Sequence, residues 1–315
     1  MNDKYDVVVV GGGAAGLSGA VALGRSRRSV LVIDAGEQRN APAEGIHNYL
    51  GREGLNPLEL VAVGREEVAR YGGTTVKGRV SEVSRRDSGF AVTLDEGREV
   101  QARRLLIATG LKDELPAVEG LAEHWGKNVI HCPYCHGYEH RDQAIGVLAT
   151  TPMAVHQALM FRQLSADVVV FAHTGPEISA DGRAQLAAVG VRVVEGEVAA
   201  VESVPGGVTG LRLTSGEVVA RQVVAVGPRF EARLDGLKGL GLETAPMEVE
   251  GFVLGTSLKV DPTGRTEVPG VWAAGNVANP MAQVMVSAGQ GLMAGAAING
   301  DLIQEEVRAA MAGTQ

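Results

Sequence analysis

The two cysteines of this 315-residue chain are Cys132 and Cys135, which lie three positions apart in the stretch HCPYCHGYE. A Cys-x-x-Cys pair can form a redox disulfide, supply half of a zinc site or, together with the following His136, attach haem. Haem attachment requires an exported protein with an axial-ligand environment, and the sequence indicates neither. A zinc site would need ligands from directly adjacent residues, and no second Cys-x-x-Cys is present to complete it.

A redox disulfide accounts for more of this stretch. Pro133 suits the first turn of a helix, where a missing N–H costs no hydrogen bond. If the cysteine pair opens a helix, the partial positive charge at the helix N-terminus favours the thiolate and lowers the cysteine pKa. His136, with an ordinary pKa of about 6.5, could then accept a proton from an incoming thiol and return one later. His131 and His140 are weaker candidates, which we expect to be polar surface residues.

Composition and charge restrict the classes of protein and partner. Hydrophobic residues make up 45% and charged residues 21%, as in ordinary globular proteins, and the formal net charge is −8. This acidic balance argues against binding to nucleic acid. No apolar run reaches the roughly 18 residues that span a bilayer, and the N-terminal MNDKYDVVVVGGG lacks a signal-peptide pattern. We therefore expect a cytoplasmic protein without a membrane partner, in which a Cys-x-x-Cys is catalytic or metal-binding rather than structural.

The N-terminal stretch YDVVVVGGGAAGLSGAVALGRSRRSVLVID predicts a dinucleotide-binding unit. A strand of valines precedes Gly11, Gly13 and Gly16. An apolar helix follows to about Gly24, and a second strand ends at Asp34. In such a unit the first glycine permits a tight turn, the second lets the backbone approach a pyrophosphate, and the third lets helix and strand pack closely. The helix N-terminus favours the phosphates, and Asp34 is placed to accept hydrogen bonds from a ribose.

A second unit with the same order of strand, turn, helix and strand begins near Gln143, in QAIGVLATTPMAVHQALMFRQLSADVVVFAHTG. Hairpins that turn at Gly97 and Gly216 also recur, so we expect two related nucleotide-binding halves. Where the first half has its glycines, the second has the run Ala149-Thr150-Thr151-Pro152-Met153-Ala154. Pro152 has no N–H to donate, and no arginine follows the second strand to bind a 2′-phosphate. We predict that this half keeps the fold but binds nicotinamide nucleotide poorly or not at all.

Near the C-terminus, GVWAAGN predicts a buried strand that runs into Gly275 and Asn276. From Met281 onward, small and apolar residues recur at helical spacing, which indicates a Gly- and Ala-rich helix that packs tightly on its neighbours. The first turn of that helix, Ala282-Gln283-Val284, would direct backbone donors at an electron-rich group. The segment 39–54 is rich in Gly and polar residues, and we expect a loop there, near a cofactor or substrate.

Together these motifs resemble the low-molecular-weight thioredoxin reductases over essentially the whole chain. The resemblance rests on GGGAAG with Asp34, on IATG ending at Gly110, on the Cys-x-x-Cys between the halves and on PGVWAAGNV with its helix. It implies a homodimer and an α/β fold with two Rossmann-like dinucleotide-binding domains. These are a discontinuous FAD domain, residues 1–117 and 245–315, and a central domain, residues 118–244, that carries the cysteines. The residues implied to contact FAD are Gly11, Gly13, Ala14, Ala15, Gly16, Asp34, Asn48, Gly110, Gly275, Asn276, Gln283 and Val284.

Three departures from the reductases narrow this resemblance. Asn276 replaces the usual Asp, although its amide can still bond a ribityl hydroxyl. His136 follows the second cysteine where the reductases have Asp, and the second glycine motif with its arginines is absent. CPYCHGYE beside an altered NADPH site is similar to the FAD-dependent dithiol oxidases that close disulfides in natural products such as holomycin and gliotoxin. By this resemblance, Cys132 exchanges with substrate and Cys135 lies nearer the flavin.

We therefore expect an FAD-dependent thiol-disulfide oxidoreductase without a metal, in which Cys132, Cys135 and His136 are the catalytic residues. It would oxidise a small-molecule dithiol, with O2 as the electron acceptor. One alternative is a thioredoxin reductase-like enzyme that reduces a protein disulfide with electrons from NADPH or ferredoxin. A second alternative is a non-enzymatic thiol sensor or a zinc-stabilised binding protein.

Overall fold

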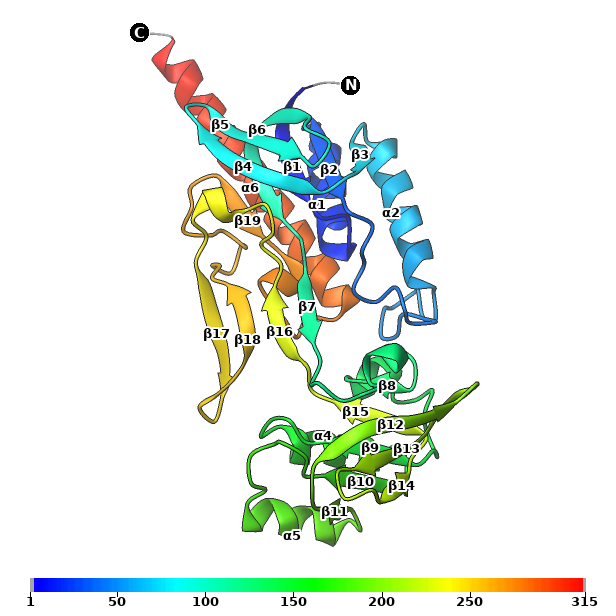
Figure 1. The fold of residues 1–315 in the computed structure, drawn as a ribbon. Helices are drawn as coiled ribbons and strands as arrows, with labels where there is room; N and C mark the ends of the chain where they lie inside the picture. The colour runs from blue at the N-terminus through cyan, green and yellow to red at the C-terminus, as the bar shows by residue number, and fades with distance from the viewer. Residues whose placement is uncertain (1–2, 314–315) are drawn as a thin grey trace.

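The computed structural model describes residues 3–313, which form two parts, each built on a parallel sheet and joined by a pair of strands (Figure 1). The first sheet has the strand order β3-β2-β1-β6-β5-β4, with β19 paired to β6. Strands β1, β2, β3, β6 and β19 run parallel, whereas β4 and β5 extend the sheet from β6 as an antiparallel meander. These strands are β1 (Lys4–Val10), β2 (Val30–Asp34), β3 (Thr74–Lys77), β4 (Val80–Arg86), β5 (Gly89–Leu94), β6 (Glu99–Ile107) and β19 (Val271–Ala273).

Both faces of β1 are covered, which explains its unbroken run of valines. Val7 and Val9 pack with residues of helices α1 (Ala14–Arg25), α2 (Pro57–Arg70) and α6 (Val284–Ala312). Val8 and Val10 face the other way and pack with residues of the meander and of the short helix η2 (Lys238–Leu240). The predicted order of strand, glycine turn, helix and strand at the N-terminus is confirmed.

Helices α1 and α6 approach each other closely because glycines line their contact. A Cβ atom on Gly291 would lie 2.0 Å from the carbonyl oxygen of Ala15, and one on Gly295 would lie 2.8 Å from that of Gly19. The predicted tight packing of the Gly- and Ala-rich helix is therefore confirmed. The helix begins at Val284, however, and not at Met281 as the pattern predicted.

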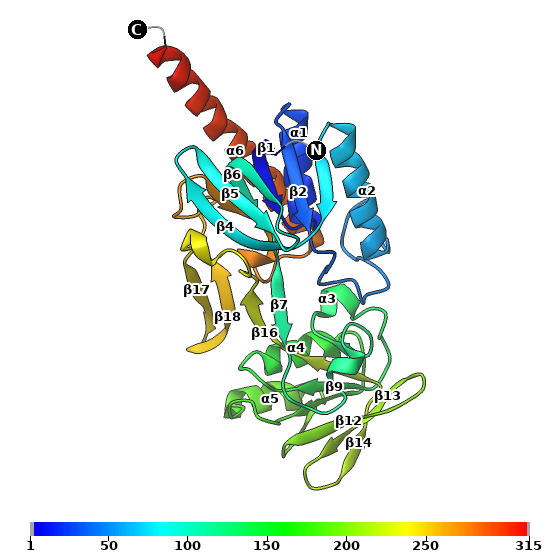
Figure 2. The same ribbon diagram turned by 45° about the horizontal axis from the view of Figure 1, so that its top comes forward.

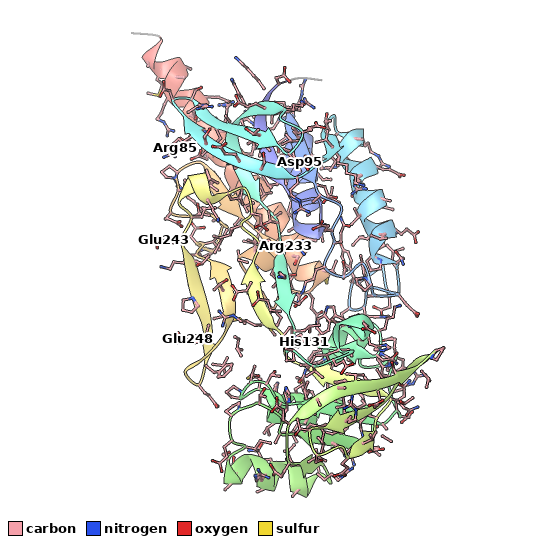
Figure 3. All side chains as sticks on the ribbon, in the orientation of Figure 1. Arg85, Asp95, His131, Arg233, Glu243 and Glu248 are labelled. Carbon is pink, nitrogen blue, oxygen red and sulfur yellow. The ribbon has the colours of Figure 1, made fainter. Side chains whose placement is uncertain are left out.

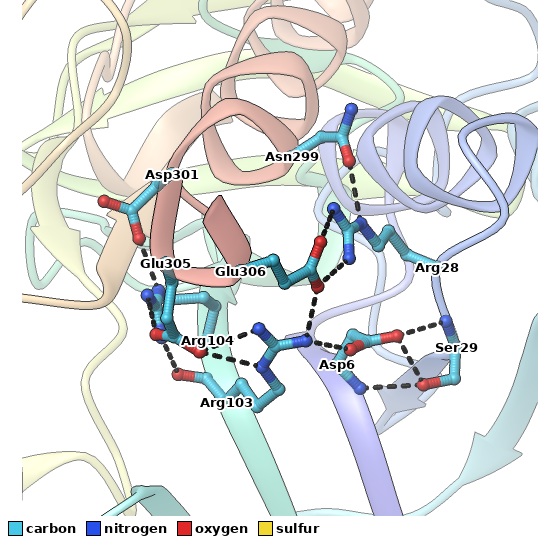
Figure 4. A network of polar contacts seen from close by, with 9 residues as sticks. All are labelled: Asp6, Arg28, Ser29, Arg103, Arg104, Asn299, Asp301, Glu305 and Glu306. Atoms are coloured by element: carbon cyan, nitrogen blue, oxygen red, sulfur yellow. Dashed lines mark hydrogen bonds and ion pairs between the residues drawn. The ribbon is translucent and has the colours of Figure 1, made fainter. Parts of the chain in front are cut away.

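Ion pairs attach the C-terminal half of α6 to the first sheet (Figure 4). Arg103 of β6 pairs with Glu305 at 2.7 Å and with Glu306 at 2.9 Å, while Arg104 pairs with Asp301 at 2.6 Å. The helix is thus fixed to β6 at one end and to α1 in its middle. Its N-terminus is thereby held at the carboxyl edge of the sheet.

The second part repeats this layout around a parallel sheet of order β11-β10-β9-β15-β8. Helices α4 (Ala154–Arg162) and α5 (Ala180–Ala188) pack on one face, and an antiparallel sheet of β12, β13 and β14 packs on the other. The strands are β8 (Val129–Ile130), β9 (Ile145–Leu148), β10 (Val168–Phe171), β11 (Arg192–Val194), β12 (Val198–Val204), β13 (Gly207–Leu213), β14 (Val218–Ala220) and β15 (Val223–Val226). The predicted fold class, α/β with two Rossmann-like units, is confirmed.

Strands β7 (Leu111–Glu114) and β16 (Arg229–Ala232) pair antiparallel and join the two parts (Figures 1 and 2). With β17 (Thr244–Val249) and β18 (Phe252–Leu258) they form a sheet of order β17-β18-β16-β7. Residues 229–240 fall inside the segment 118–244, which we expected to form the central domain. In the structure, β16 pairs with β18, and Leu237 and Leu240 pack in the core of the first part. Within residues 3–313, no helix combines the length and apolar character that crossing a membrane requires.

Candidate active site

A cavity of about 440 Å³ lies where the carboxyl ends of β1, β2, β6 and β19 meet the cysteine segment. Of the predicted site residues, its wall contains Gly11, Gly13, Ala14, Ala15, Asp34, Gly110, Cys132, Cys135, His136, Gly275, Asn276, Gln283 and Val284. Gly16 and Asn48 do not belong to this wall. The structure therefore brings the cysteines and most of the predicted flavin contacts to one cavity.

The turn after β1 requires its glycines for three different reasons. Gly11 has a φ of +109°, and a Cβ there would lie 2.3 Å from the carbonyl oxygen of Ala108. Gly16 lies beneath the turn, where a Cβ would come within 1.9 Å of the carbonyl oxygen of Gly11. A Cβ on Gly13 would meet no atom within 4 Å, so this backbone borders open space. The space lies at the N-terminus of α1, whose N-cap has no side-chain hydrogen bond.

Asp34 ends β2 as a buried acceptor at the wall of the cavity. Its side chain accepts hydrogen bonds from Arg65 at 2.6 Å, from Gln38 at 3.0 Å and from the N–H of Gly36 at 3.1 Å. Only 5% of the residue is exposed. An acid in this position is the one that accepts ribose hydroxyls in dinucleotide-binding units.

Asn276 lies in the short helix η3 (Gly275–Val277) and fixes the chain that leads into α6. Its Nδ2 donates to the carbonyl oxygens of Asn279, Pro280 and Ala282, at 3.1, 3.2 and 2.8 Å. These bonds hold residues 279–282 in an irregular segment and explain why α6 starts late. An ionised aspartate at this position would have no hydrogen-bond donor for these three carbonyl oxygens.

The cavity has the features that FAD requires of this fold. An open glycine turn at the N-terminus of α1 suits a pyrophosphate, the buried Asp34 suits a ribose, and the uncapped start of α6 supplies free backbone donors. Gly11, Gly13, Asp34, Gly275 and Gln283 are the residues of the wall that could hold these groups.

Cys132 and Cys135 are free thiols of a single helical turn, α3 (Pro133–His136). Cys132 is the N-cap of this turn, and Cys135 lies within it. The predicted helix start at Pro133 is confirmed. A hydrogen bond from the Cys135 thiol lowers the pKa of Cys132 to about 7, aided by the backbone N–H groups of Cys135 and Tyr134 against the effect of burial. The same sulfur–sulfur hydrogen bond raises the pKa of Cys135. In the dithiol form, therefore, the proton stays on Cys135 and the thiolate forms at Cys132.

The three histidines near the cysteines differ in their surroundings. His136 lines the cavity, and burial lowers its pKa, so the ring is neutral at pH 7. His140 turns away, with its ring bound to the carbonyl oxygen of Lys127 at 3.0 Å. Within residues 3–313, no three or more His, Cys, Asp or Glu side chains are placed to share a metal ion.

His131, which we expected to be a polar surface residue, is half-buried. Its Nδ1 lies 3.2 Å from the carbonyl oxygen of Val226, and the edge of its ring meets Phe230 at a centroid distance of 5.3 Å. His131 lies at the junction of the two parts (Figure 3) and belongs to the wall of the cavity. Burial lowers the pKa of this ring as well. The strand β8 directly before His131 brings its ring to Val226 and Phe230.

Sequence reasoning missed a charged pair in the same wall. Arg39, from the loop after β2, binds Asp113 of β7 through two hydrogen bonds of 2.7 and 2.6 Å. Both residues line the cavity with the cysteines. No local motif marks the pair, because the two residues are 74 positions apart and meet only in the folded chain.

The loop 39–54 lies beside α3 (Figure 2) and contacts the cysteine segment. Asn48, at a φ of +60°, donates from Nδ2 to the carbonyl oxygen of Tyr134 at 2.6 Å. Nε2 of His47 lies 3.4 Å from Glu139. The expectation of a loop near the site is confirmed, and Asn48 is bound to the cysteine segment instead of facing the cavity.

In the second part, the turn after β9 corresponds to the turn after β1 but has another geometry. Gly11 donates its N–H to the carbonyl oxygen of Ile33 at 2.8 Å, and Ala149 donates in the same way to Phe171 at 2.9 Å. Ala149 therefore aligns with Gly11, but it does not share the φ of +109°. By the same alignment α4, which starts at Ala154, begins two residues later than α1.

Threonine side chains hold this altered turn closed. Thr150 Oγ1 donates to the carbonyl oxygen of Gly227 at 2.9 Å, and Thr151 Oγ1 accepts from the N–H of Met153 at 3.3 Å. Pro152 lies between these threonines and helix α4, and it has no N–H to donate. The turn thus has fewer free backbone donors for a phosphate than its counterpart in the first part.

Comparison with known proteins agrees with this architecture. A family model described as pyridine nucleotide-disulphide oxidoreductase matches residues 5–291. Thioredoxin reductase sirT of Leptosphaeria maculans is 31% identical over 313 residues, which cover 94% of this chain and 93% of that protein. A protein named probable thioredoxin reductase from Arthroderma benhamiae is 36% identical over 175 residues, which cover 53% of this chain and 43% of that protein.

Among solved structures, the crystal structure of HlmI is similar with a TM-score of 0.91 and 42% sequence identity, over 99% of this chain and 97% of that one. The resemblance to thioredoxin reductases that the motifs suggested is thereby confirmed. The chain belongs to the pyridine nucleotide-disulphide oxidoreductase family, and it is an FAD-dependent thiol-disulfide oxidoreductase similar to the thioredoxin reductases.

Proposed function

We propose that this flavoenzyme is a dithiol oxidase, which closes a disulfide in a small-molecule dithiol and passes the electrons to O2. The overall reaction takes two protons and two electrons from the dithiol and gives them to O2, which yields a disulfide and hydrogen peroxide. Bound FAD would supply the two-electron acceptor that connects the cysteine pair to O2.

The altered turn of the second part is the observation that carries this proposal. Thr150, Thr151 and Pro152 leave few backbone donors where a nicotinamide nucleotide would place its phosphates, while the first part keeps an open glycine turn. An enzyme with a flavin site but a poor nicotinamide site needs another source of electrons. The dithiol substrate is such a source.

The chain's own residues have complementary roles in this proposal. A substrate thiolate attacks Cys132 of the Cys132–Cys135 disulfide, which forms a mixed disulfide and releases Cys135 as a thiolate. The second substrate thiol then attacks the mixed disulfide, so that the product leaves and Cys132 becomes a thiolate. The low pKa of Cys132 suits the sulfur that exchanges in this way. His136, kept neutral by burial, accepts the proton of the incoming thiol.

Anaerobic reduction of the flavin tests the direction of electron flow. We expect a small dithiol to bleach the flavin absorbance, while NADPH and NADH at micromolar concentration leave it unchanged. Rapid bleaching by NADPH would instead establish a thioredoxin reductase-like enzyme, the alternative that the names of its relatives favour. Bleaching by reduced ferredoxin, with none by the dithiol, would establish the ferredoxin-driven form.

We further propose a division into an FAD domain and a central domain, a homodimer and a cytoplasmic location, as the family resemblance implies. Exposed apolar side chains on α6, including Met285, Leu292 and Met293, support the homodimer. Sedimentation equilibrium of the purified holoprotein measures the subunit number directly.

A further inference from the structure

Arg39 is held in one orientation by partners on three of its nitrogens. Nε and Nη2 donate to the two carboxylate oxygens of Asp113, and Nη1 donates to Oδ1 of Asn276 at 3.3 Å. The guanidinium carbon lies 5.4 Å from the ring centroid of Phe230. Such a forked pair, with its carboxylate almost fully buried, has little freedom to reorient.

This fixed charge belongs to the same cavity as the two sulfurs. Arg39, Cys132 and Cys135 all line its wall, and Phe230, on which the guanidinium rests, also touches His131 beside Cys132. The hydrogen bond from Cys135 is the main cause of the lowered pKa of Cys132, and the positive charge of Arg39 adds a smaller lowering. For Cys135, whose pKa is raised by its hydrogen bond to Cys132, the charge of Arg39 acts in the opposite direction. The guanidinium therefore acts on the cysteines across the cavity.

Asn276 keeps this region from becoming negative. Its Nδ2 is bound to three carbonyl oxygens, so its Oδ1 must face Arg39. An aspartate there would place a second carboxylate on the same guanidinium and would oppose any negative charge on the sulfurs. With Asn276, Asp113 is the one carboxylate within residues 3–313 bound to this guanidinium.

We propose that Arg39 is a positioning residue for the redox reaction, whose fixed charge stabilises the thiolate that forms when the Cys132–Cys135 disulfide is reduced. In that step the dithiol loses two electrons and two protons as its S–S bond forms. The Cys132–Cys135 bond takes up the electrons and breaks. Cys135 takes up one of the two substrate protons, and the other leaves, so that Cys132 carries the negative charge. This inference rests on the redox role of the cysteines in the proposed function, and not on O2 as the acceptor.

The test measures the ionisation of Cys132 in the reduced holoprotein. After anaerobic reduction with dithiothreitol and its removal, the rate of iodoacetamide alkylation at Cys132 is followed by peptide mass spectrometry between pH 5 and pH 10. For Arg39→Met we expect alkylation at pH 7 to slow by about threefold to tenfold, because loss of a nearby cation raises the thiol pKa. Arg39→Lys keeps the charge, and we expect its profile to remain close to wild type.

A matched control is Arg233→Met, which removes another arginine of the same wall that is paired with Glu37. We expect it to leave the alkylation profile unchanged. Asn276→Asp provides a second variant in case Arg39→Met does not fold, and it should slow alkylation in the same direction. An Arg39→Met or Asn276→Asp protein that folds, binds FAD and matches the wild-type profile would overturn the inference. The assay contains no electron acceptor, so failure of the oxidase proposal does not affect its outcome.

Discussion

At the scale of single residues, the chemistry depends on which of the two cysteine sulfurs carries the proton in the reduced pair. The hydrogen bond between the sulfurs lowers the pKa of Cys132 and raises that of Cys135. Cys132 is therefore ready to exchange near neutral pH, but Cys135 cannot give up electrons until its proton leaves. The next residue, His136, is neutral and lines the same cavity, so it is the base placed to accept the proton of the incoming substrate thiol.

His136→Gln tests this role through the pH dependence of flavin reduction. Burial lowers the pKa of His136, so the wild-type ring stays a base over a wider range and loses this function only as pH falls through that lowered pKa. We expect the variant to reduce its flavin about a hundredfold more slowly with a small dithiol at pH 7. Its rate should rise towards high pH, where the substrate thiol ionises without help.

His140→Gln is the matched control for that measurement. The His140 ring is bound to Lys127 and Gln143 and does not line the cavity, so we expect a rate at pH 7 close to wild type. His140 also helps to lower the pKa of His136, so the low-pH limb of the profile should move slightly to higher pH. Equal profiles for wild type and His136→Gln, measured by stopped-flow absorbance, would remove His136 from the mechanism.

At the scale of secondary-structure elements, the cavity depends on how closely α6 approaches α1. Gly291 makes this possible, because any side chain there would enter the backbone of α1 at Ala15. We predict that Gly291→Ala lowers the free energy of unfolding by about 1–3 kcal/mol, as overpacking of a tight contact does. Because α6 carries Gln283 and Val284 at the cavity, the variant should also retain less FAD.

Gly289→Ala is the matched substitution two residues away on the same helix. A Cβ on Gly289 would meet no atom within 4 Å, so alanine should stabilise the helix by about 0.5–1 kcal/mol. Urea denaturation followed by circular dichroism gives both values. A Gly291→Ala protein as stable as Gly289→Ala would show that α6 can move away from α1 without cost.

The elements that the sequence predicted correctly are those with a strong local pattern. The valine strand β1, the glycine turn and α1 follow from hydrophobic period and glycine spacing. The helical turn at Pro133 follows from the suitability of proline for the first turn of a helix. The start of α6 could not be predicted, because the amide of Asn276 sets it through bonds to residues 279–282. The partial burial of His131 and the pair of Arg39 with Asp113 depend on contacts between distant segments, which no local pattern records.

At the scale of the whole molecule, the site exists only while the two parts keep their relative position. The cavity takes its glycine turn from the first part and its cysteines from the second. Besides the β7–β16 pair, the loop after β2 contacts the cysteine segment through Asn48 and His47. Pro42 of the same loop packs closely on Gly126 of the second part. A Cβ atom added to Gly126 would lie 2.7 Å from the Cβ of Pro42. These contacts hold α3 against the flavin-binding part.

Asn48 tests how much this loop contributes, because its amide donates a hydrogen bond of 2.6 Å to the carbonyl oxygen of Tyr134 in the cysteine segment. Asn48→Asp tolerates the positive φ equally well but replaces the donor by a carboxylate that faces the Tyr134 carbonyl. We expect backbone amides of residues 132–137 to exchange with deuterium about threefold to tenfold faster, since one net hydrogen bond is worth about 0.5–1.5 kcal/mol. Leu50→Ala, which changes an 87% exposed side chain in the same loop, should leave that exchange unchanged. Identical exchange in all three proteins would mean that the strands β7 and β16 alone hold the cysteines at the cavity.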